Sequence, residues 1–385
     1  MHAIERLRTV PQLSGAKRNS GEKFALKNFI RWLKLCPPKI GATALCVMLS
    51  SPASAGSGVA VTASGTPSYG IALQLPPGIA GMTPNLGLAF TGGGVNGPVG
   101  YGWTIQGIST ITRCPGTVAT DGAIKGVFFA RTDKLCLDGQ RLIRTNASGQ
   151  PSAANPAANG ALEDAVGLGA GATTEFRTEK DTYARIRAYG YAGGDATGNS
   201  GPAYFMVWTK SGQIYEYGAS PGADANTNAL VAAQGKSIPM AWAVSRISDP
   251  LSNYIDFKYI QRDSYWGTGP LGGIVQNGRE WNLVEVQYTG HGTQAPTNKV
   301  VFDYADRPDT PGHPQDRAEA YQQGSKNVSI WRLQAIRSYV NWNGPALGVV
   351  PQGTAFPSVP YLMPDVGTLA TPPASAVKVK TVKIV

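Results

Sequence analysis

The feature that most constrains this chain is a two-residue alternation of apolar and smaller or polar side chains, interrupted every few residues by glycine or proline. It is clearest between Leu73 and Arg113, where Leu86, Leu88 and Phe90 alternate with smaller residues. A period of two places one face of a strand against a core, and Pro-Gly or Gly-rich runs end the strand. The sequence therefore predicts a series of short strands joined by turns.

Composition indicates the same fold class. The 385 residues include 48 Gly and 28 Pro, 42% are hydrophobic and only 15% are charged. Such a chain has many turn residues and enough apolar material for a large core. We predict an all-β fold of successive antiparallel hairpins with Gly/Pro-rich turns and at most one short helix. That helix is expected at residues 314–323, where Asp316 comes early and Gly324 follows the end.

The net charge of +10 lies mostly in the first 55 residues. That segment holds nine Lys and Arg against two Glu, which leaves a net charge of +3 for the rest of the chain. A nucleic-acid partner requires a basic surface on the folded part of the protein, so none is predicted.

The N-terminal segment resembles an export signal. Residues 23–39 are basic, residues 40–49 are an uncharged apolar run, and Ala53 and Ala55 form a small-x-small signal peptidase site. The apolar run is shorter than the ~20 residues of a membrane-spanning helix, so stable membrane insertion of the mature chain is not expected. We predict export through the inner membrane to a secreted or cell-surface location. An amphipathic N-terminal helix on a cytoplasmic protein is the alternative.

Two cysteines, Cys114 and Cys136, remain after this leader. An even number in an exported chain favours a disulfide, and turn signals at 115–116 and 121–122 would let the segment fold back as a hairpin. Two buried free thiols are the alternative. Two cysteines supply too few ligands for a zinc site, and neither a metal nor a cofactor is predicted.

Composition divides the chain into five segments. They are a signal peptide with a long basic region (1–55), an N-terminal β region (56–144), a flexible loop rich in Ala, Gly and Asn (145–173), a hairpin-rich β region (174–342), and a Pro-rich segment with a terminal edge strand (343–385). The terminal strand alternates valine and lysine. As an exposed sheet edge it would need a partner.

The N-terminal β region contains five short motifs: LPPG, P-x-L-x-L, G-x-G-W, G-x-S-x-I-x-R and a later L-C-L-D-G-Q-R-L run. Their positions with an expected structural role are Pro76, Pro77, Gly78, Gly100, Gly102, Trp103, Arg113, Gly139 and Arg141. In this set, and in the hairpins at 204–218 and 242–259, the chain resembles the Salmonella virulence plasmid B protein family. That family includes the B components of insecticidal toxin complexes and Rhs-type proteins. One departure is Ser252, which stands where the family usually has glycine.

The resemblance implies an architecture and no catalytic residue. In the family such regions build a β-rich shell that encloses or carries a toxic C-terminal portion, which in some members is an ADP-ribosyltransferase. The implied partners are a downstream toxin or Rhs polypeptide, or other subunits of a toxin complex. We therefore expect an exported structural segment of a toxin-complex or Rhs-like protein.

A search for catalytic residues finds little. The three histidines are His2 in the leader and His291 and His313 in loops, and none is flanked by a catalytic or metal-binding motif. An enzyme is not predicted. Two alternatives remain: a carbohydrate-binding β module at the cell surface, or the truncated N-terminal part of a toxin whose enzymatic domain is missing. The first rests on the tryptophans: Trp103, Trp208, Trp242, Trp266, Trp281, Trp331 and Trp342.

Overall fold

The computed structural model describes residues 59–62, 65–94, 96–130, 133–145, 173–194, 200–223, 228–268, 274–306, 318–322, 324–329, 331–343 and 372–384. The leader with Ala53 and Ala55, and nearly all of the loop predicted at 145–173, lie outside these ranges.

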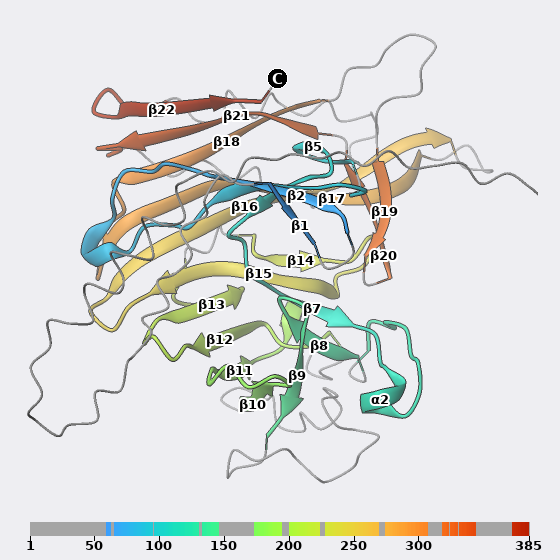
Figure 1. The fold of residues 1–385 in the computed structure, drawn as a ribbon. Coiled ribbons are helices and arrows are strands. Elements are labelled where there is room, and N and C mark those ends of the chain that lie inside the picture. Colours follow the sequence, from blue (N-terminus) through green and yellow to red (C-terminus); the bar gives the residue numbers. More distant parts are fainter. Residues whose placement is uncertain are drawn as a thin grey trace, which may run out of the picture. The chain divides into compact units, whose positions relative to one another are not determined.

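The N-terminal part forms a small antiparallel sheet of four strands in the order β1-β2-β3-β6 (Figure 1). The strands are β1 (Val59–Val61), β2 (Pro67–Ala72), β3 (Gly87–Thr91) and β6 (Trp103–Gln106). A 3-10 turn, η1 (Ile79–Gly81), and a two-stranded ribbon of β4 (Asn96–Gly97) and β5 (Gly100–Tyr101) lie in its connections. The alternation of Leu86, Leu88 and Phe90 predicted this sheet, and Leu88 on β3 faces the core.

The rest of the described chain forms one sheet of sixteen strands. They are β7 (Thr110–Cys114), β8 (Lys134–Leu137), β9 (Gln140–Arg144), β10 (Thr173–Thr178), β11 (Arg185–Tyr189), β12 (Tyr204–Trp208), β13 (Ile214–Gly218), β14 (Leu230–Ala232), β15 (Pro239–Ser248), β16 (Asn253–Thr268), β17 (Ile274–His291), β18 (Asn298–Asp306), β19 (Ala318–Gln322), β20 (Ser325–Ser329), β21 (Trp331–Val340) and β22 (Val377–Lys383). A short 3-10 turn, η3 (Ala192–Gly194), follows β11. The all-β prediction is confirmed.

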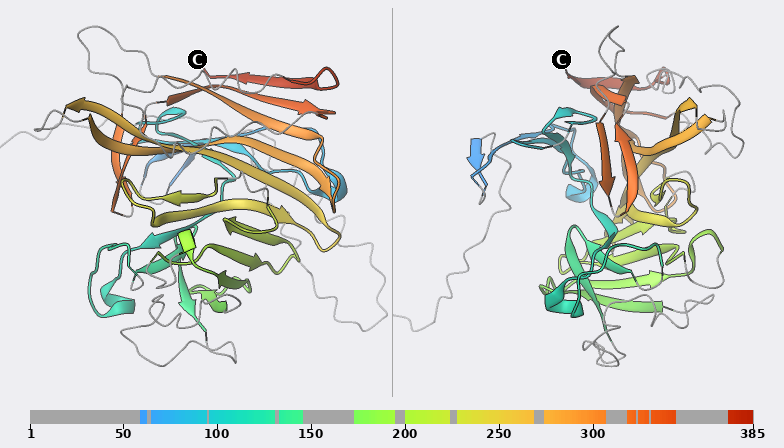
Figure 2. Two further views of the ribbon diagram at one scale, coloured as in Figure 1. Left: turned by 180° about the vertical axis from the view of Figure 1, so that it is seen from behind. Right: turned by 90° about the vertical axis from the view of Figure 1, so that its right-hand side faces the viewer.

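Eight of these strands close into a ring. From β7 to β13 each strand pairs with the next along the chain, and β15 pairs with both β7 and β13. Closure leaves no free edge within the ring, which is one way in which antiparallel sheets avoid edge-to-edge aggregation. We call these strands, β7 to β13 and β15, the eight-stranded ring. Strands β7 to β13 lie below β15 in Figure 1 and in the rear view of Figure 2.

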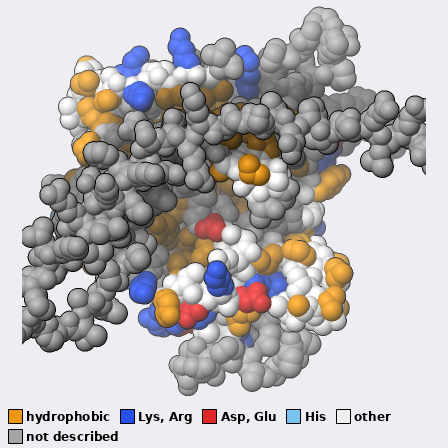
Figure 3. Space-filling model, viewed as in Figure 1, with side chains coloured by type: hydrophobic (Ala, Val, Ile, Leu, Met, Phe, Trp, Pro, Cys, Tyr) orange, Lys and Arg blue, Asp and Glu red, His pale blue; other side chains and the backbone are white. Residues whose placement is uncertain are grey.

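The same β15 also leads into an open sheet. Its C-terminal half pairs with β16, and the order continues through β17, β18 and β21 to β22. β16 and β17 are long, with 16 and 18 residues. β22 ends the order with its outer edge unpaired in the part of the chain that is described, and Lys and Arg side chains gather along this end of the sheet (Figure 3).

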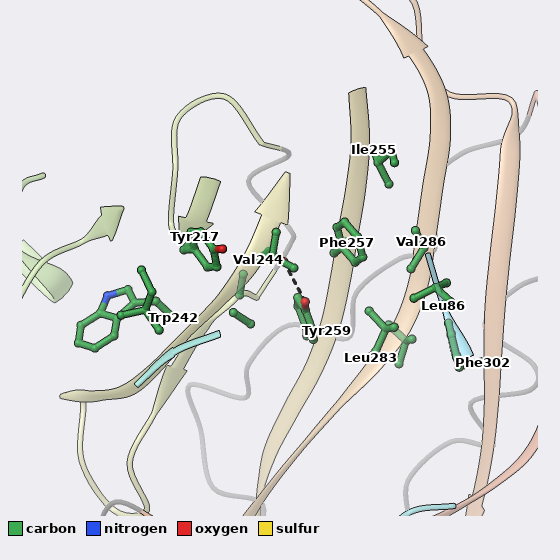
Figure 4. Close-up of a cluster of buried hydrophobic side chains, with 14 of the residues drawn as sticks. Leu86, Tyr217, Trp242, Val244, Ile255, Phe257, Tyr259, Leu283, Val286 and Phe302 are labelled. Carbon is green, nitrogen blue, oxygen red and sulfur yellow. Dashed lines mark hydrogen bonds between the residues drawn. The ribbon is translucent and has the colours of Figure 1, made fainter. Parts of the chain in front are cut away.

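The apolar face of the open sheet joins the interior of the ring in one core. Phe257 and Tyr259 of β16 and Phe302 of β18 are buried in it, beside Trp242 of β15 (Figure 4). The Tyr259 hydroxyl donates a hydrogen bond to the Val244 carbonyl at 2.8 Å, so this buried phenol keeps a polar partner. The core therefore crosses from one part of the sheet to the other without a break.

The opposite face of the open sheet carries ion pairs beside a small apolar cluster of Val301, Tyr339 and Trp342. The Lys299 ammonium lies 2.9 Å from the Glu285 carboxylate, with the side chains 2% and 0% exposed. Arg246 holds Asp256 through two hydrogen bonds of 2.6 and 2.8 Å. The polar positions of the alternating pattern are thus charged groups paired across strands, and several of them are buried.

The prediction of a helix at 314–323 is wrong for residues 318–322, the part of this segment that the structure describes. Residues 318–322 form β19, which pairs with β20 as an antiparallel hairpin, and Gly324 (φ 76°) lies in the connecting turn. The glycine therefore belongs to a hairpin turn and not to a helix end. The α-helix of the described residues is α2 (Val118–Asp121), inside the segment predicted as a simple hairpin. Gly122 ends α2 with φ 70°.

The turn between β15 and β16 contains a non-glycine residue in a left-handed conformation. Ser252 has φ 68°, in the position where glycine is usual in the family. We expect Ser252→Gly to raise the free energy of unfolding by about 1 kcal/mol, because glycine adopts positive φ without strain. Urea denaturation checks this. Leu251→Gly in the same turn is the control, and an equal gain in both variants would contradict the conformational explanation.

Candidate functional site

A cavity beside the eight-stranded ring is lined by parts of three sequence motifs, at Pro84, Ser109 and Asp138. The cavity has a volume of about 620 Å³ and is lined from three directions. Met82 and Ile108 come from the connections of the N-terminal sheet, Val207 and Tyr217 from the ring, and Phe257 from the open sheet. A concave, mainly apolar space with a few polar groups is the usual setting of a binding site, so its polar groups decide what it can do.

The polar groups at this cavity form a short hydrogen-bonded chain. The Ser109 hydroxyl lies 2.6 Å from Asp138 Oδ2 and 2.9 Å from the Tyr217 hydroxyl, and the Thr110 N–H donates to Asp138 Oδ1 at 2.8 Å. Burial raises the pKa of the Tyr217 phenol, against the opposing effect of the Ser109 hydrogen bond. The phenol therefore stays neutral. The two Asp138 oxygens bind Ser109 and Thr110, and so hold the backbone at the start of β7 in place.

Asp138 and Gly139 also form the two-residue turn between β8 and β9. Their φ values are 48° and 81°, as a type I′ turn requires, and Asp-Gly is a residue pair that favours this turn. The motif glycine thus allows the turn, and the aspartate connects the turn to β7.

Arg113 is the centre of a second buried network. Its guanidinium is 0% exposed and donates to four groups. They are the Pro239 carbonyl (2.8 Å), the Ala130 carbonyl (2.9 Å), Asp133 Oδ2 (2.9 Å) and the Ser200 carbonyl (2.9 Å). Burial lowers the pKa of Arg113, and the charge of Asp133 opposes that shift. One side chain therefore joins β7 to β15, to the segment before β8 and to the segment before β12.

The loop from Cys114 to Cys136 is closed at its base. The two sulfur atoms are bonded, the pairing that the sequence favours, and β7 and β8 pair as antiparallel neighbours on either side of the loop. Asp121 at the end of α2 accepts a hydrogen bond from Arg141 and lies 3.6 Å from Lys134 Nζ. The motif residue Arg141 therefore ties the loop to β9.

Asp121 gives this loop a pH dependence. Burial raises the pKa of Asp121, but hydrogen bonds from Arg141 and the Thr117 N–H outweigh it, so the pKa lies below the ordinary value of 3.8. A depressed carboxyl pKa stabilises the fold at pH above the unfolded value, and this contribution is lost as pH falls through the folded pKa.

We expect Asp121→Asn to cost about 1–3 kcal/mol near pH 7, because Arg141 and Lys134 lose their anionic partner. The difference from wild type should shrink as the pH falls below about 4. Denaturation series at several pH values measure both effects. A difference that stays constant down to pH 2 would contradict this assignment, and Asp181→Asn, in an exposed loop, is the control.

The LPPG motif lies across the open sheet. The Pro76 carbonyl accepts a hydrogen bond from the Tyr288 hydroxyl at 3.0 Å, and the Pro77 carbonyl lies 3.4 Å from Asn298 Nδ2. Burial raises the pKa of Tyr288 to about 12. At Gly78 a Cβ atom would lie 1.8 Å from the Met82 carbonyl oxygen, so only glycine fits. The motif attaches the N-terminal sheet to β17 and β18.

The G-x-G-W motif has a local packing role. Gly100 and Gly102 have φ values of 118° and 76°. A Cβ at Gly102 would lie 2.8 Å from the Thr91 carbonyl oxygen, so the glycine permits close approach of the backbone. Trp103 packs against the Phe90 ring with a centroid distance of 5.5 Å. These residues shape the N-terminal sheet.

The other polar candidates also have structural contacts. His291 Nδ1 lies 3.1 Å from Asn253 Oδ1 at the end of β17, and His313 is outside the described residues. Within the described ranges, no group of three or more His, Cys, Asp or Glu is placed to hold a metal ion. A search of the same ranges finds no helix long and apolar enough to cross a membrane.

The tryptophan side chains that the structure describes are buried or partly buried. Trp242, Trp331 and Trp342 are buried, and Trp103, Trp208 and Trp281 are partly covered. The Trp266 side chain lies outside the described set. The Trp242 indole N–H donates to the Pro202 carbonyl at 2.8 Å, as expected for a core residue.

Some residues at these networks were not singled out by their sequence pattern. Asp133 accepts hydrogen bonds from Arg113 and from two backbone N–H groups at 128 and 130, and Tyr217 closes the chain from Ser109. Their partners are 20 and 108 residues away in sequence, so no local spacing identifies them. The tyrosine alternation of β13 predicts a buried phenol and leaves its partner unknown.

Comparison with known proteins gives one family. The model of the family described as Salmonella virulence plasmid 65kDa B protein matches residues 61–334. A search of curated proteins finds no match to the chain.

Several solved structures are similar in fold. The crystal structure of TcdB2-TccC3 is 18% identical, with a TM-score of 0.51, and the match covers 74% of this chain and 14% of that chain. The same complex without its hypervariable C-terminal region gives the same values. The N-terminal domain of effector protein SpvB from Salmonella typhimurium strain LT2 is 19% identical, with a TM-score of 0.48, over 70% of this chain and 87% of that domain. The present chain therefore corresponds to a small part of the TcdB2-TccC3 chain.

Proposed function

The chain belongs to the Salmonella virulence plasmid 65kDa B protein family, and from this premise we propose that it is an exported, non-catalytic structural segment. In this proposal it helps to form a β shell that encloses or presents a toxin cargo. The fold similarity to TcdB2-TccC3 supports a role of this kind. Its partners would be a downstream toxin or Rhs polypeptide, or other subunits of a toxin complex.

The observation that carries the proposal is the outer edge of β22. This strand ends the open sheet, and Val377 and Val379 are 54% and 53% exposed. The unpaired backbone N–H and C=O groups of an edge strand are a template for pairing with another strand. A wall that continues into a neighbouring polypeptide would cover this edge and complete the shell.

A single substitution can block that edge without disturbing β21. The Ile384 N–H donates to the Gln334 carbonyl at 2.8 Å, so by alternation the N–H of Thr381 points away from β21. Thr381→Pro removes this outward donor, and Thr381→Ala retains it. The two variants therefore separate edge pairing from loss of the side chain.

The test is co-expression of the full chain with the polypeptide encoded downstream. We expect the two to co-purify and the chain to slow proteolysis of the downstream polypeptide. Thr381→Pro should weaken co-purification by about tenfold or more, and Thr381→Ala should leave it unchanged. A wild-type chain that neither binds nor protects the downstream polypeptide would refute the shell proposal.

Export is the second part of the proposal. Support comes from the basic, apolar and small-x-small order of the leader and from the Cys114–Cys136 disulfide, since disulfides persist in oxidising compartments. We expect mass spectrometry of the secreted or periplasmic protein to find Gly56 at its N-terminus. Ala55→Arg should leave the uncleaved form at the membrane, and intact protein confined to the cytoplasm would refute export.

The two alternative functions, a carbohydrate-binding module and a truncated toxin, are tested by other experiments. A carbohydrate-binding module requires exposed aromatic faces, which the described tryptophan side chains do not offer. A glycan array with Trp208→Ala as the paired variant tests it. A toxin with a separate enzymatic domain is tested by the sequence of the downstream reading frame.

A further inference from the structure

The loop between Cys114 and Cys136 exposes an unusual amount of apolar surface. Val118, Ile124 and Phe128 are 62%, 81% and 69% exposed. They come from one segment, between two cysteines 22 positions apart, that leaves and re-enters the eight-stranded ring at neighbouring strands. Hydrophobic side chains are visible over the α2 region at the lower right of Figure 3. We call residues 115–130 the apolar loop.

The apolar loop is held in one conformation. The disulfide closes its base, and the Gly116 N–H donates to the Lys125 carbonyl at 2.8 Å, which pinches the loop around α2. The Thr117 side chain accepts from the Thr120 N–H and caps α2. Phe129 next to the exposed Phe128 is buried, 5.8 Å from the Arg113 guanidinium. The exposed side chains are therefore presented by a rigid support.

The charges around the apolar loop are basic. Asp121 in the loop is 3% exposed and Asp133 just after the loop is 1% exposed, and both are paired with cations of the fold. Lys125 between the apolar tips is exposed, and Lys236 lies 5.9 Å from the Phe129 ring. No accessible carboxylate in the described part of the loop offsets these lysines.

The hairpin of β19 and β20 extends this surface. A Cβ at Gly324 in its turn would lie 3.3 Å from Phe129 Cε2, so the turn packs beside the loop. The hairpin carries Tyr321, which is 77% exposed, and Lys326. Its acidic residue, Glu319, lies 2.8 Å from Lys326 and is neutralised by it. Tyrosine and lysine beside exposed aliphatic tips are typical of side chains at a membrane interface.

We propose that the apolar loop is a contact site for an anionic lipid surface, with Ile124 and Phe128 entering the interface and Lys125 contacting lipid headgroups. A protein partner would need a matching concave surface of roughly 800 Å² for a stable complex. Separate protruding tips on a small convex loop fit a deformable medium without such complementarity. This contact is peripheral and reversible, and it stands apart from the shell proposal.

The test uses the full chain and a reporter placed in the loop, because the basic leader can itself bind membranes. Phe128→Trp adds one tryptophan at an apolar tip to the eight native ones. Leu251→Trp, at a position that is also 69% exposed but in the turn between β15 and β16, is the matched control. Each variant is mixed with vesicles of brominated phosphatidylcholine and phosphatidylglycerol, whose bromine atoms quench tryptophan that enters the interface.

We expect the added emission of Phe128→Trp to shift to the blue and to be quenched, and that of Leu251→Trp to stay unchanged. Adding Ile124→Ser and Lys125→Gln to Phe128→Trp should weaken the vesicle partitioning seen by this reporter about tenfold. High salt or vesicles of phosphatidylcholine alone should weaken it as well.

Three results would overturn the proposal. They are an unquenched Phe128→Trp, equal quenching of both reporters, and equal quenching on neutral and anionic vesicles. A reporter that lipid leaves unchanged but that shifts to the blue when a toxin-complex subunit is added would identify the loop as a protein interface.

Discussion

Arg113→Met is expected to lower the free energy of unfolding by about 3–5 kcal/mol, the usual effect of removing one partner of a buried charge pair. The substitution removes four hydrogen bonds and leaves the Asp133 carboxylate, which is 1% exposed, without its cation. Methionine fills a similar volume, so the loss would come from polarity and not from a cavity. Urea denaturation of the purified variant measures it.

Two further variants make this prediction specific. Arg113→Lys keeps the charge but supplies fewer donors in a different geometry, so it should recover only part of the loss. Arg185→Met removes an arginine that is 46% exposed and pairs with Glu175, and it should change stability by less than about 1 kcal/mol. If Arg113→Met and Arg185→Met were equally stable, the network around Arg113 would not be a main stabilising contact of the fold.

Glu285→Met is expected to have an effect of similar size, about 3–5 kcal/mol, for a different part of the molecule. The Glu285 carboxylate lies 2.9 Å from Lys299 Nζ, and Lys258 is the cross-strand neighbour of Glu285 on β16. Both lysine side chains are buried, so removing the carboxylate leaves two cations in a site with little water. Chemical denaturation again provides the measurement.

The matched rescue replaces the whole set. Lys258→Met with Glu285→Met and Lys299→Met removes all three of these buried charges, and we expect the triple variant to regain most of the stability lost by Glu285→Met. Glu319→Met, which breaks the pair with Lys326 at a partly exposed site, should change stability by less than about 1 kcal/mol. A triple variant no more stable than the single one would show that these groups act independently.

Hairpins with short turns were predictable from the sequence. The hairpin predicted at 204–218 and the terminal alternating strand, β22 (Val377–Lys383), both occur where the pattern indicates, and the Asp138-Gly139 turn has residues that favour it. Each is determined by residues close together in the chain, because alternation sets the faces and the turn residues set the register. The motif residues were also identified, although only the structure shows that Arg113 spans three segments.

Three features could not be predicted in this way, and the first two depend on distant contacts. Closure of the ring requires β15 to pair with β7 and β13, and no local signal specifies either pairing. The buried charges at Lys258, Glu285 and Lys299 look like solvent-facing residues of an alternating strand. The segment 318–322 has helix-forming residues, yet its pairing with β20 overrides that propensity.

The position of β15 in the ring has a consequence for the order in which the chain can fold. Ile111 of β7 pairs with Trp242, roughly 130 residues later. One edge of β7 therefore stays unpaired until β15 has been synthesised. Pairings of such long sequence separation form slowly, and synthesis from the N-terminus produces β15 long after β7. A holdase chaperone that binds the edge of β7 during that interval should therefore raise the yield of native protein, and a refolding experiment with and without such a chaperone would measure the gain.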